Sequence, residues 1–187
     1  DGDDSLDAVI TVNLLDRAVD EAIKSGKVAK TASIGYMGNY NFVIYRDGFS
    51  GKLSSAKAVA SSPKAKLKVS FENIRSDKRK DVLVDYRILN AAYRNFFTIS
   101  NGNLLRVNQV KLFDGIGTED AVGFVLQYED GMISNSKDIV SYKGTFENPT
   151  FTIPDDVYTF EPEITKTSEI QERWFFNPED MKYYLKK

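Results

Sequence analysis

The chain has 187 residues, a net charge of −2, 42% hydrophobic and 28% charged residues, which is the composition of an ordinary folded globular protein. It contains no His and no Cys, which excludes Ser-His and Cys-His nucleophiles, thiolate metal sites and disulfides. No apolar run approaches the roughly 18 residues that a membrane-spanning helix needs.

The N-terminal part predicts a leader, a strand and a helix. Residues 1–7 are short and acidic and indicate a flexible leader, and residues 8–12 predict a short strand. Apolar residues then recur at the three- and four-residue spacing of an amphipathic helix over about residues 14–25. Asn13 can cap the start of this helix, and Gly26 can end it.

After Gly26 the apolar period changes from 3.6 to 2, which is typical of β-strands. Asn101-Gly102 is a strong hairpin signal because this pair tolerates the positive φ of a tight turn. At the end of the chain, Asn177-Pro178 followed by two acidic residues predicts a short C-terminal helix to about residue 186. About nine strands are expected after the first helix: 34–36, 41–46, 66–74, 82–88, 97–100, 104–107, 122–128, 139–142 and 157–160.

These elements predict a mostly β protein, folded as a single antiparallel β-sandwich of the immunoglobulin-like or fibronectin-like kind. A short N-terminal amphipathic helix and a short C-terminal helix accompany the sandwich. A lipocalin-like β-barrel is the alternative. Since no internal repeat or linker divides the chain, residues 8–187 are expected to form one β-rich domain after the 1–7 leader.

Three short strings resemble known proteins. Val43-Ile44-Tyr45-Arg46-Asp47-Gly48 resembles the strand and turn of fibronectin type III and related immunoglobulin-like modules, and Val84-Asp85-Tyr86-Arg87 resembles a strand of Calx-β-like domains. Asp1-Gly2-Asp3-Asp4-Ser5 resembles the segment after the lipidated cysteine of Bacteroidetes surface lipoproteins. These resemblances imply a β-sandwich protein that lies in the bacterial cell envelope (periplasm or outer-membrane surface) or is secreted. Because the chain begins without Met, we expect upstream processing, and membrane attachment only through an upstream lipid anchor.

Charge is unevenly distributed along the chain, because residues 46–94 hold 12 Lys and Arg against 5 Asp and Glu. A basic block can mark a nucleic acid or another anionic partner. Lys64, Lys66 and Lys68 alternate with apolar residues, so the solvated face of a strand is the simpler interpretation. The basic and aromatic groups do not interleave as in single-strand nucleic-acid binders, so no nucleic-acid partner is expected.

Aromatic residues are the main candidates for ligand binding. An exposed ring can stack on the apolar face of a sugar while neighbouring polar side chains bind its hydroxyl groups. Packing in the core is the alternative role for such rings, since aromatic residues favour strands. The candidate ligand-binding residues are Tyr36, Tyr40, Tyr45, Arg173 and Trp174.

Acidic residues offer a second kind of site. Asp114, Glu119 and Asp120 supply oxygen ligands in a Gly-containing loop that suits Ca²⁺, although the EF-hand spacing is not met and a plain hairpin loop has the same composition. Adjacent acids on a strand point to opposite faces, so pairs such as Glu129-Asp130 do not form a glycosidase dyad by themselves. No catalytic residue and no other cofactor is predicted.

The expected function is a non-catalytic cell-envelope or secreted module that binds a glycan or a surface protein. One alternative is a structural subunit of a surface complex or pilus, in which terminal strands pair with neighbours. Further alternatives are a hydrolase that uses carboxylates only and a small-ligand carrier with a cavity inside closed strands.

Overall fold

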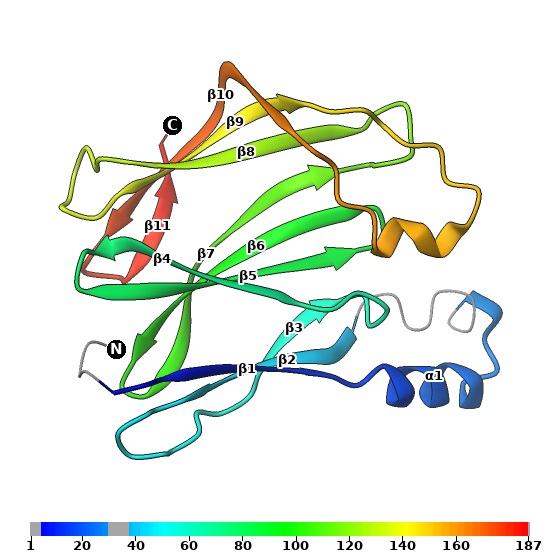
Figure 1. Cartoon of the computed structure of the whole chain (residues 1–187), viewed down its shortest axis with the longest axis horizontal. Coiled ribbons are helices and arrows are strands. Elements are labelled where there is room, and N and C mark those ends of the chain that lie inside the picture. The colour runs from blue at the N-terminus through cyan, green and yellow to red at the C-terminus, as the bar shows by residue number, and fades with distance from the viewer. Residues whose placement is uncertain (1–4, 30–37, 187) are drawn as a thin grey trace.

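Figure 1 shows the computed structural model of the chain, which describes residues 5–29 and 38–186. The elements have the following bounds: β1 Ala8–Asn13, α1 Leu15–Lys24, β2 Gly38–Arg46, β3 Lys57–Ser61, β4 Lys68–Ser76, β5 Arg79–Ile88, β6 Ala91–Ser100, β7 Asn103–Asp114, β8 Val122–Glu129, β9 Asp138–Thr145, the 3-10 helix η1 Pro154–Tyr158, β10 Thr165–Asn177 and β11 Lys182–Leu185. The strands form two antiparallel sheets, with the orders β1-β2-β3 and β11-β10-β9-β8-β7-β6-β5-β4. The predicted mostly β, antiparallel sandwich is confirmed.

The larger sheet folds over at the junction between β7 and β8. β7 pairs with β6 over most of its length, but with β8 only through Phe113 with Gly123 and Asp114 with Val122. The strands therefore form three layers, with β4–β7 between β1–β3 on one side and β8–β11 on the other (Figure 1). The strand order is linear from β11 to β4, so the alternative lipocalin-like barrel is not formed.

Two hydrophobic clusters hold these layers together. Between the middle layer and β9–β11 lie Ile74, Leu83, Phe96, Val107, Val110, Ile139, Trp174, Phe176 and Tyr183. Between the middle layer and the small sheet lie Val43, Tyr45, Val59, Val82, Val84, Tyr86, Phe97 and Leu104. Since β5 contributes to both clusters with alternate side chains, this strand is covered on both faces.

Charged side chains share one face of β5 with Leu83. A strand covered on both faces is usually apolar throughout, but the alternation of β5 places Asp81, Asp85 and Arg87 on the face toward β8–β11. Each of them has an oppositely charged partner, as buried charges require. The ion pairs are Arg75–Asp81 at 2.7 Å, Arg94–Asp85 at 2.6 Å and Arg87–Glu161 at 2.8 Å.

The predicted N-terminal strand and helix are confirmed. β1 pairs with β2, and α1 lies within the predicted range of about 14–25. The Asn13 side chain accepts a hydrogen bond from the Leu15 amide at 3.1 Å, and Gly26 adopts a φ of 64° after the helix. The predicted strand at 34–36 and residues 1–4 of the leader lie outside the described residues.

The predicted C-terminal helix is wrong, because β10 and β11 form a hairpin there. The Asn177 side chain accepts a hydrogen bond from the Glu179 amide at 2.9 Å, as an N-cap does, but the chain then turns back through Met181 at a φ of 56°. Tyr183 packs in the core, and its hydroxyl donates to the Lys137 carbonyl at 3.0 Å. Tertiary packing therefore overrides the local helix signal.

Other boundaries also differ from the sequence pattern. The predicted strand at 157–160 is wrong, because residues 154–158 form η1. β3 occupies a segment that the sequence pattern does not predict as a strand. Within residues 5–29 and 38–186, no helix is both long and apolar enough to cross a membrane.

The two-sided burial of β5 makes a stability prediction. Leu83→Ala removes a side chain that is 1% exposed and leaves a cavity, so we expect the free energy of unfolding to fall by about 3 kcal/mol. Leu105→Ala on β7 is the matched control, since Leu105 is 42% exposed, and should cost less than about 1 kcal/mol. Urea unfolding of both variants measures the difference. Equal losses would contradict the three-layer packing.

Candidate functional site

The structure places two of the predicted ligand-binding rings in the core. Tyr45 is 0% exposed and Trp174 is 8% exposed, so neither ring offers a face to a ligand, and the expectation of an exposed platform at these positions is wrong. Tyr40 is half-buried, and its hydroxyl donates to the Glu21 carboxylate of α1 at 2.6 Å. Tyr36 lies outside the described residues.

Arg173 is held by two acidic residues rather than pointing freely into solvent. Its guanidinium donates to Glu129 at 2.7 Å and to Asp138 at 3.0 Å. Asp138 is buried, and its second carboxylate oxygen has no hydrogen-bond partner among the described residues. Arg173 therefore compensates a buried charge on the sheet, and it does not form one ligand site with Trp174, which packs in the core.

The predicted calcium ligands are not gathered around one point. Asp114 forms an ion pair with Lys111 on the same strand, whereas Glu119 and Asp120 are exposed in the following turn. In the part of the chain that the structure describes, no group of three or more acidic side chains is placed to hold a metal ion. The turn is instead held by Asn148, whose side chain accepts from the Gly117 amide at 2.8 Å.

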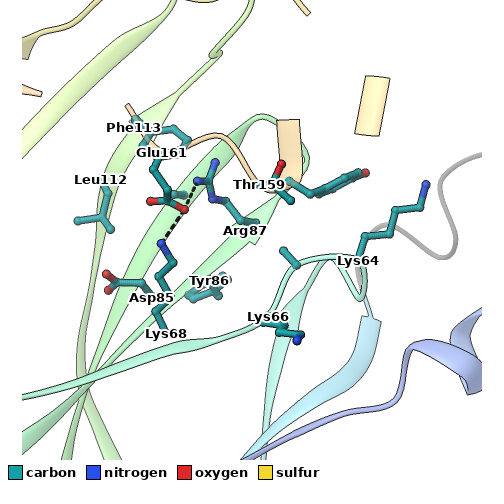
Figure 2. A pocket seen from close by; sticks show the side chains of 13 residues that line it. Lys64, Lys66, Lys68, Asp85, Tyr86, Arg87, Leu112, Phe113, Thr159 and Glu161 are labelled. Carbon is teal, nitrogen blue, oxygen red and sulfur yellow. Dashed lines mark hydrogen bonds and ion pairs between the residues drawn. The ribbon is translucent and has the colours of Figure 1, made fainter. Parts of the chain in front are cut away.

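A pocket of about 330 Å³ lies at one end of the middle layer, with Tyr158 of η1 among its lining residues (Figure 2). It brings together the turn between β3 and β4, strands β5–β7 and the connector from β9 to β10. Ligand pockets are typically about 300–1,000 Å³ and combine apolar walls with a few polar groups. The lining residues that matter here are basic (Lys64, Lys66, Lys68 and Arg87), acidic (Asp85 and Glu161) and apolar or aromatic (Ala92, Leu112, Phe113 and Tyr158).

The turn between β3 and β4 is fixed to the end of β5. The Ser62 amide donates to the Arg87 carbonyl at 2.7 Å, and the Ser62 hydroxyl accepts from the Leu89 amide at 3.0 Å. The buried Asn41 side chain also donates to the Ser62 carbonyl, at 3.2 Å. This anchored backbone holds the alternating lysines that follow along one edge of the pocket.

Arg87 joins the connector from β9 to β10 to the middle layer. Its side chain is 7% exposed and donates to the Val157 carbonyl at 3.3 Å, to the Phe160 carbonyl and to Glu161 at 2.8 Å. The guanidinium also lies over the Phe113 ring, 4.5 Å from its centroid, in cation–π geometry. Arg87 is therefore a structural clamp that holds the connector through three hydrogen bonds.

Glu161 lies between two cations. One of its carboxylate oxygens is 2.8 Å from Lys68 Nζ and 2.8 Å from the Arg87 guanidinium, as the dashed lines in Figure 2 show. Burial by itself raises the pKa of this carboxyl, but the hydrogen bonds from Lys68 and Arg87 outweigh burial and lower the pKa. Glu161 is therefore ionised at neutral pH.

The other charges of the pocket differ in how fully they are paired. Lys64 binds both carboxylate oxygens of Asp155, at 2.7 and 2.9 Å, and lies over the Tyr158 ring at 5.7 Å. Asp85 is held by Arg94 through two hydrogen bonds, at 2.6 and 2.7 Å. Lys66 is exposed and makes no ion pair with any described residue. The pocket thus keeps an excess of positive charge at its lysine edge.

Carboxylate hydrolysis needs two acids facing one another with one of them kept neutral. Burial raises the pKa of Asp81, although the charge and hydrogen bonds of Arg75 lower it in part. Asp81 is almost fully buried, and its two oxygens accept from the Arg75 side chain at 2.7 Å and the Arg75 amide at 3.0 Å. Its carboxyl is thus covered by Arg75 and is not open to a substrate.

Comparisons of the chain with known family models, with curated proteins and with solved structures found no match. The functional interpretation therefore rests on the chemistry of the pocket itself.

The sequence pattern misses this pocket for two reasons. The alternation of Lys64, Lys66 and Lys68 predicts the solvated face of a strand, but only Lys68 lies in a strand, β4, and the pattern does not show what lies opposite these lysines. Glu161 comes from a connector whose path over β5 leaves no local signal. The excess of basic residues over 46–94 is the one signal in the sequence that points to the pocket.

The clamp can be tested by Arg87→Met, which removes the donors to the connector but keeps much of the side-chain volume. We expect the free energy of unfolding to fall by about 3 kcal/mol, because carbonyls and a carboxylate lose a buried partner. Amide hydrogen exchange over residues 154–161 should accelerate more than elsewhere. Arg79→Met, at an exposed position of the same strand, is the control. Unchanged exchange in Arg87→Met would exclude the clamp.

The pKa of Glu161 gives a second test. Since its folded pKa lies below the ordinary value of 4.5, its ion pairs stabilise the fold above about pH 4.5, and this contribution is lost as pH falls through the folded pKa. Lys68→Met should raise the Glu161 pKa by removing one of the two cations. Titration of the ¹³C carboxyl signal measures the midpoint in both proteins. A midpoint that does not move would show that Lys68 does not bind Glu161 in solution.

Proposed function

We propose that this chain is a non-catalytic binding module that takes an acidic saccharide in the pocket edged by Lys64, Lys66 and Lys68. The observation that carries the proposal is the uneven pairing of the charges in this pocket. Lys66 has no ion-pair partner among the described residues, and Lys68 shares its partner with Arg87. An anionic group that enters from solvent can therefore meet the exposed Lys68 ammonium group, and Lys66 is a second exposed lysine among the lining residues.

The opposite wall of the pocket supports a saccharide rather than a simple ion. Leu112 and Tyr158 are partly exposed and contribute apolar and aromatic surface, whereas Ala92 and Phe113 are almost fully buried. The C–H faces of a sugar ring can pack on such a wall while its acidic group binds the lysines. The volume of about 330 Å³ is at the lower end of the range for ligand pockets. It suits one end of a saccharide rather than a long stretch of the saccharide chain.

The acidic groups of the pocket support binding without catalysis. Asp85 is fully engaged with Arg94, and the pKa of Glu161 is lowered by its two cations once burial is outweighed. An ionised and paired carboxylate is a poor general acid. With no His or Cys in the chain, the described residues around the pocket hold no neutral acid beside an ionised one.

We propose that the protein performs this binding in the bacterial cell envelope or after secretion from a bacterium. The support is the resemblance of residues 1–5 to the segment after the lipidated cysteine of surface lipoproteins, together with the absence of Cys. Acidic polysaccharides are available ligands in such a setting.

Lys66→Ala tests the proposed function without disturbing an ion pair of the fold. We expect it to weaken binding of a galacturonate trisaccharide by about tenfold, because an accessible ammonium group loses its charge-assisted hydrogen bond. Lys52→Ala, in the exposed loop between β2 and β3 at the other end of the molecule, is the control and should bind as the parent does (Figure 1). Isothermal titration calorimetry at about 50 mM salt measures both.

The neutral galactose trisaccharide provides the ligand control for the same experiment. It should bind at least about tenfold more weakly than the galacturonate trisaccharide, and the difference should shrink at high salt because exposed charges are screened. If the parent protein binds neither a galacturonate nor a sulfated trisaccharide, the proposed function is wrong.

A further inference from the structure

We propose that Glu161 occupies the anion position of this pocket in the free protein, and that the ligand group that replaces it at Lys68 is a carboxylate, as in a uronic acid. This inference rests on the proposed function, and it adds the class of acidic group and the way in which the chain regulates access to it.

The position of Glu161 shows which anion the pocket accepts. Its carboxylate bridges Lys68 on β4 and Arg87 on β5, at 2.8 Å from each (Figure 2). The planar carboxylate of a uronic acid has the same shape, charge and hydrogen-bonding oxygens as the Glu161 side chain. A ligand carboxylate at Lys68 therefore reproduces a contact that the pocket already makes.

The two halves of the bridge differ in how easily they break. The Lys68 side chain is 60% exposed and that of Glu161 is 55% exposed, and such surface ion pairs contribute little to stability because solvent screens them. Arg87 is nearly buried and has Glu161 as its ion-pair partner, so the half of the bridge between Glu161 and Arg87 stays in place. The bond from Glu161 to Lys68 is thus the one that a ligand can displace at low cost.

Lys68 is the partner that can move. Its side chain is 60% exposed on β4, whereas Glu161 is held by the nearly buried Arg87. The other depression that Glu161 lines is shared with the acidic Glu147 and Glu163, which disfavours a shift of Glu161 toward it. No other carboxylate lining the pocket bridges a buried and an exposed cation, because Asp85 is bound through both oxygens to Arg94.

The Glu161 carboxylate, as an anion already present in the pocket, affects both how tightly a saccharide binds and which saccharides bind. A neutral saccharide cannot replace the charge on Lys68, so it must bind beside an intact Lys68–Glu161 pair. A uronate gives Lys68 another carboxylate to bind and leaves Glu161 with Arg87 as its remaining cation. Because Glu161 competes for the same cation, its removal should strengthen the binding of the carboxylate ligand.

Glu161→Gln is the decisive variant, since it keeps the size of the side chain and removes its charge. We expect the galacturonate trisaccharide to bind about two- to fivefold more tightly than to the parent, which is the effect of freeing one exposed ion pair. Glu163→Gln is the matched control, two residues along the same connector and also exposed, and should leave affinity unchanged. Calorimetry with the parent and both variants gives the comparison.

A second measurement does not depend on the stability of any variant. In the parent protein, saturation with galacturonate trisaccharide should raise the pKa of Glu161, because the ligand takes Lys68 from it. Titration of the Glu161 ¹³C carboxyl signal with and without ligand measures this change. The neutral trisaccharide should leave that titration unchanged.

The outcomes separate the inference from the proposed function. If the parent binds galacturonate through Lys66 but Glu161→Gln binds with equal or lower affinity, and the Glu161 titration does not move, the inference is overturned and the proposed function stands. If a sulfated trisaccharide of equal length binds as tightly as galacturonate, the assignment of a carboxylate is overturned. If no acidic trisaccharide binds the parent or Glu161→Gln, the proposed function itself fails.

Discussion

The arrangement of this molecule depends on one constraint, which is that a guanidinium lies on a strand covered on both faces. Arg87 stands on β5, between the small sheet and the layer formed by β8–β11. A buried charge without partners costs several kcal/mol, so the chain must supply acceptors above the strand. It does so with the connector between β9 and β10, through the Val157 and Phe160 carbonyls, the Glu161 carboxylate and the Phe113 ring.

The shape of the connector follows from this requirement. Its carbonyls turn toward Arg87, so they do not take part in a sheet, and residues 154–158 form η1 where the apolar pattern predicts a strand. The connector therefore crosses the end of the middle layer at a distance set by one arginine side chain. The space left between the connector and the lysine edge is the pocket. One buried charge thus accounts for both the wrong strand prediction and the presence of a site.

Whether a feature of the fold or of the pocket can be predicted from the sequence depends on how far apart along the chain the interacting residues are. The strand 82–88, the helix at 14–25 and the Asn101-Gly102 hairpin come from local periodicity and turn chemistry, and the structure has all three. Asn177 is also recognised correctly as a capping residue, but Tyr183 decides through distant core contacts that the chain turns into a hairpin. Tyr45 and Trp174 fail as site residues for the same reason, since packing partners far along the chain bury them.

The charges of the pocket argue for recognition by exchange of partners rather than by transfer of protons. Each carboxylate near the lysines is held by at least one cation, and the pKa of Glu161 is lowered because two cations outweigh the effect of its burial. A carboxyl that acts as a general acid needs the opposite environment, in which burial outweighs the charges around it. A group kept ionised between one buried and one exposed cation can still be released from the exposed one. In our proposal, that difference in burial between Arg87 and Lys68 lets a single glutamate anchor the fold on one side and give up its exposed cation to a ligand on the other.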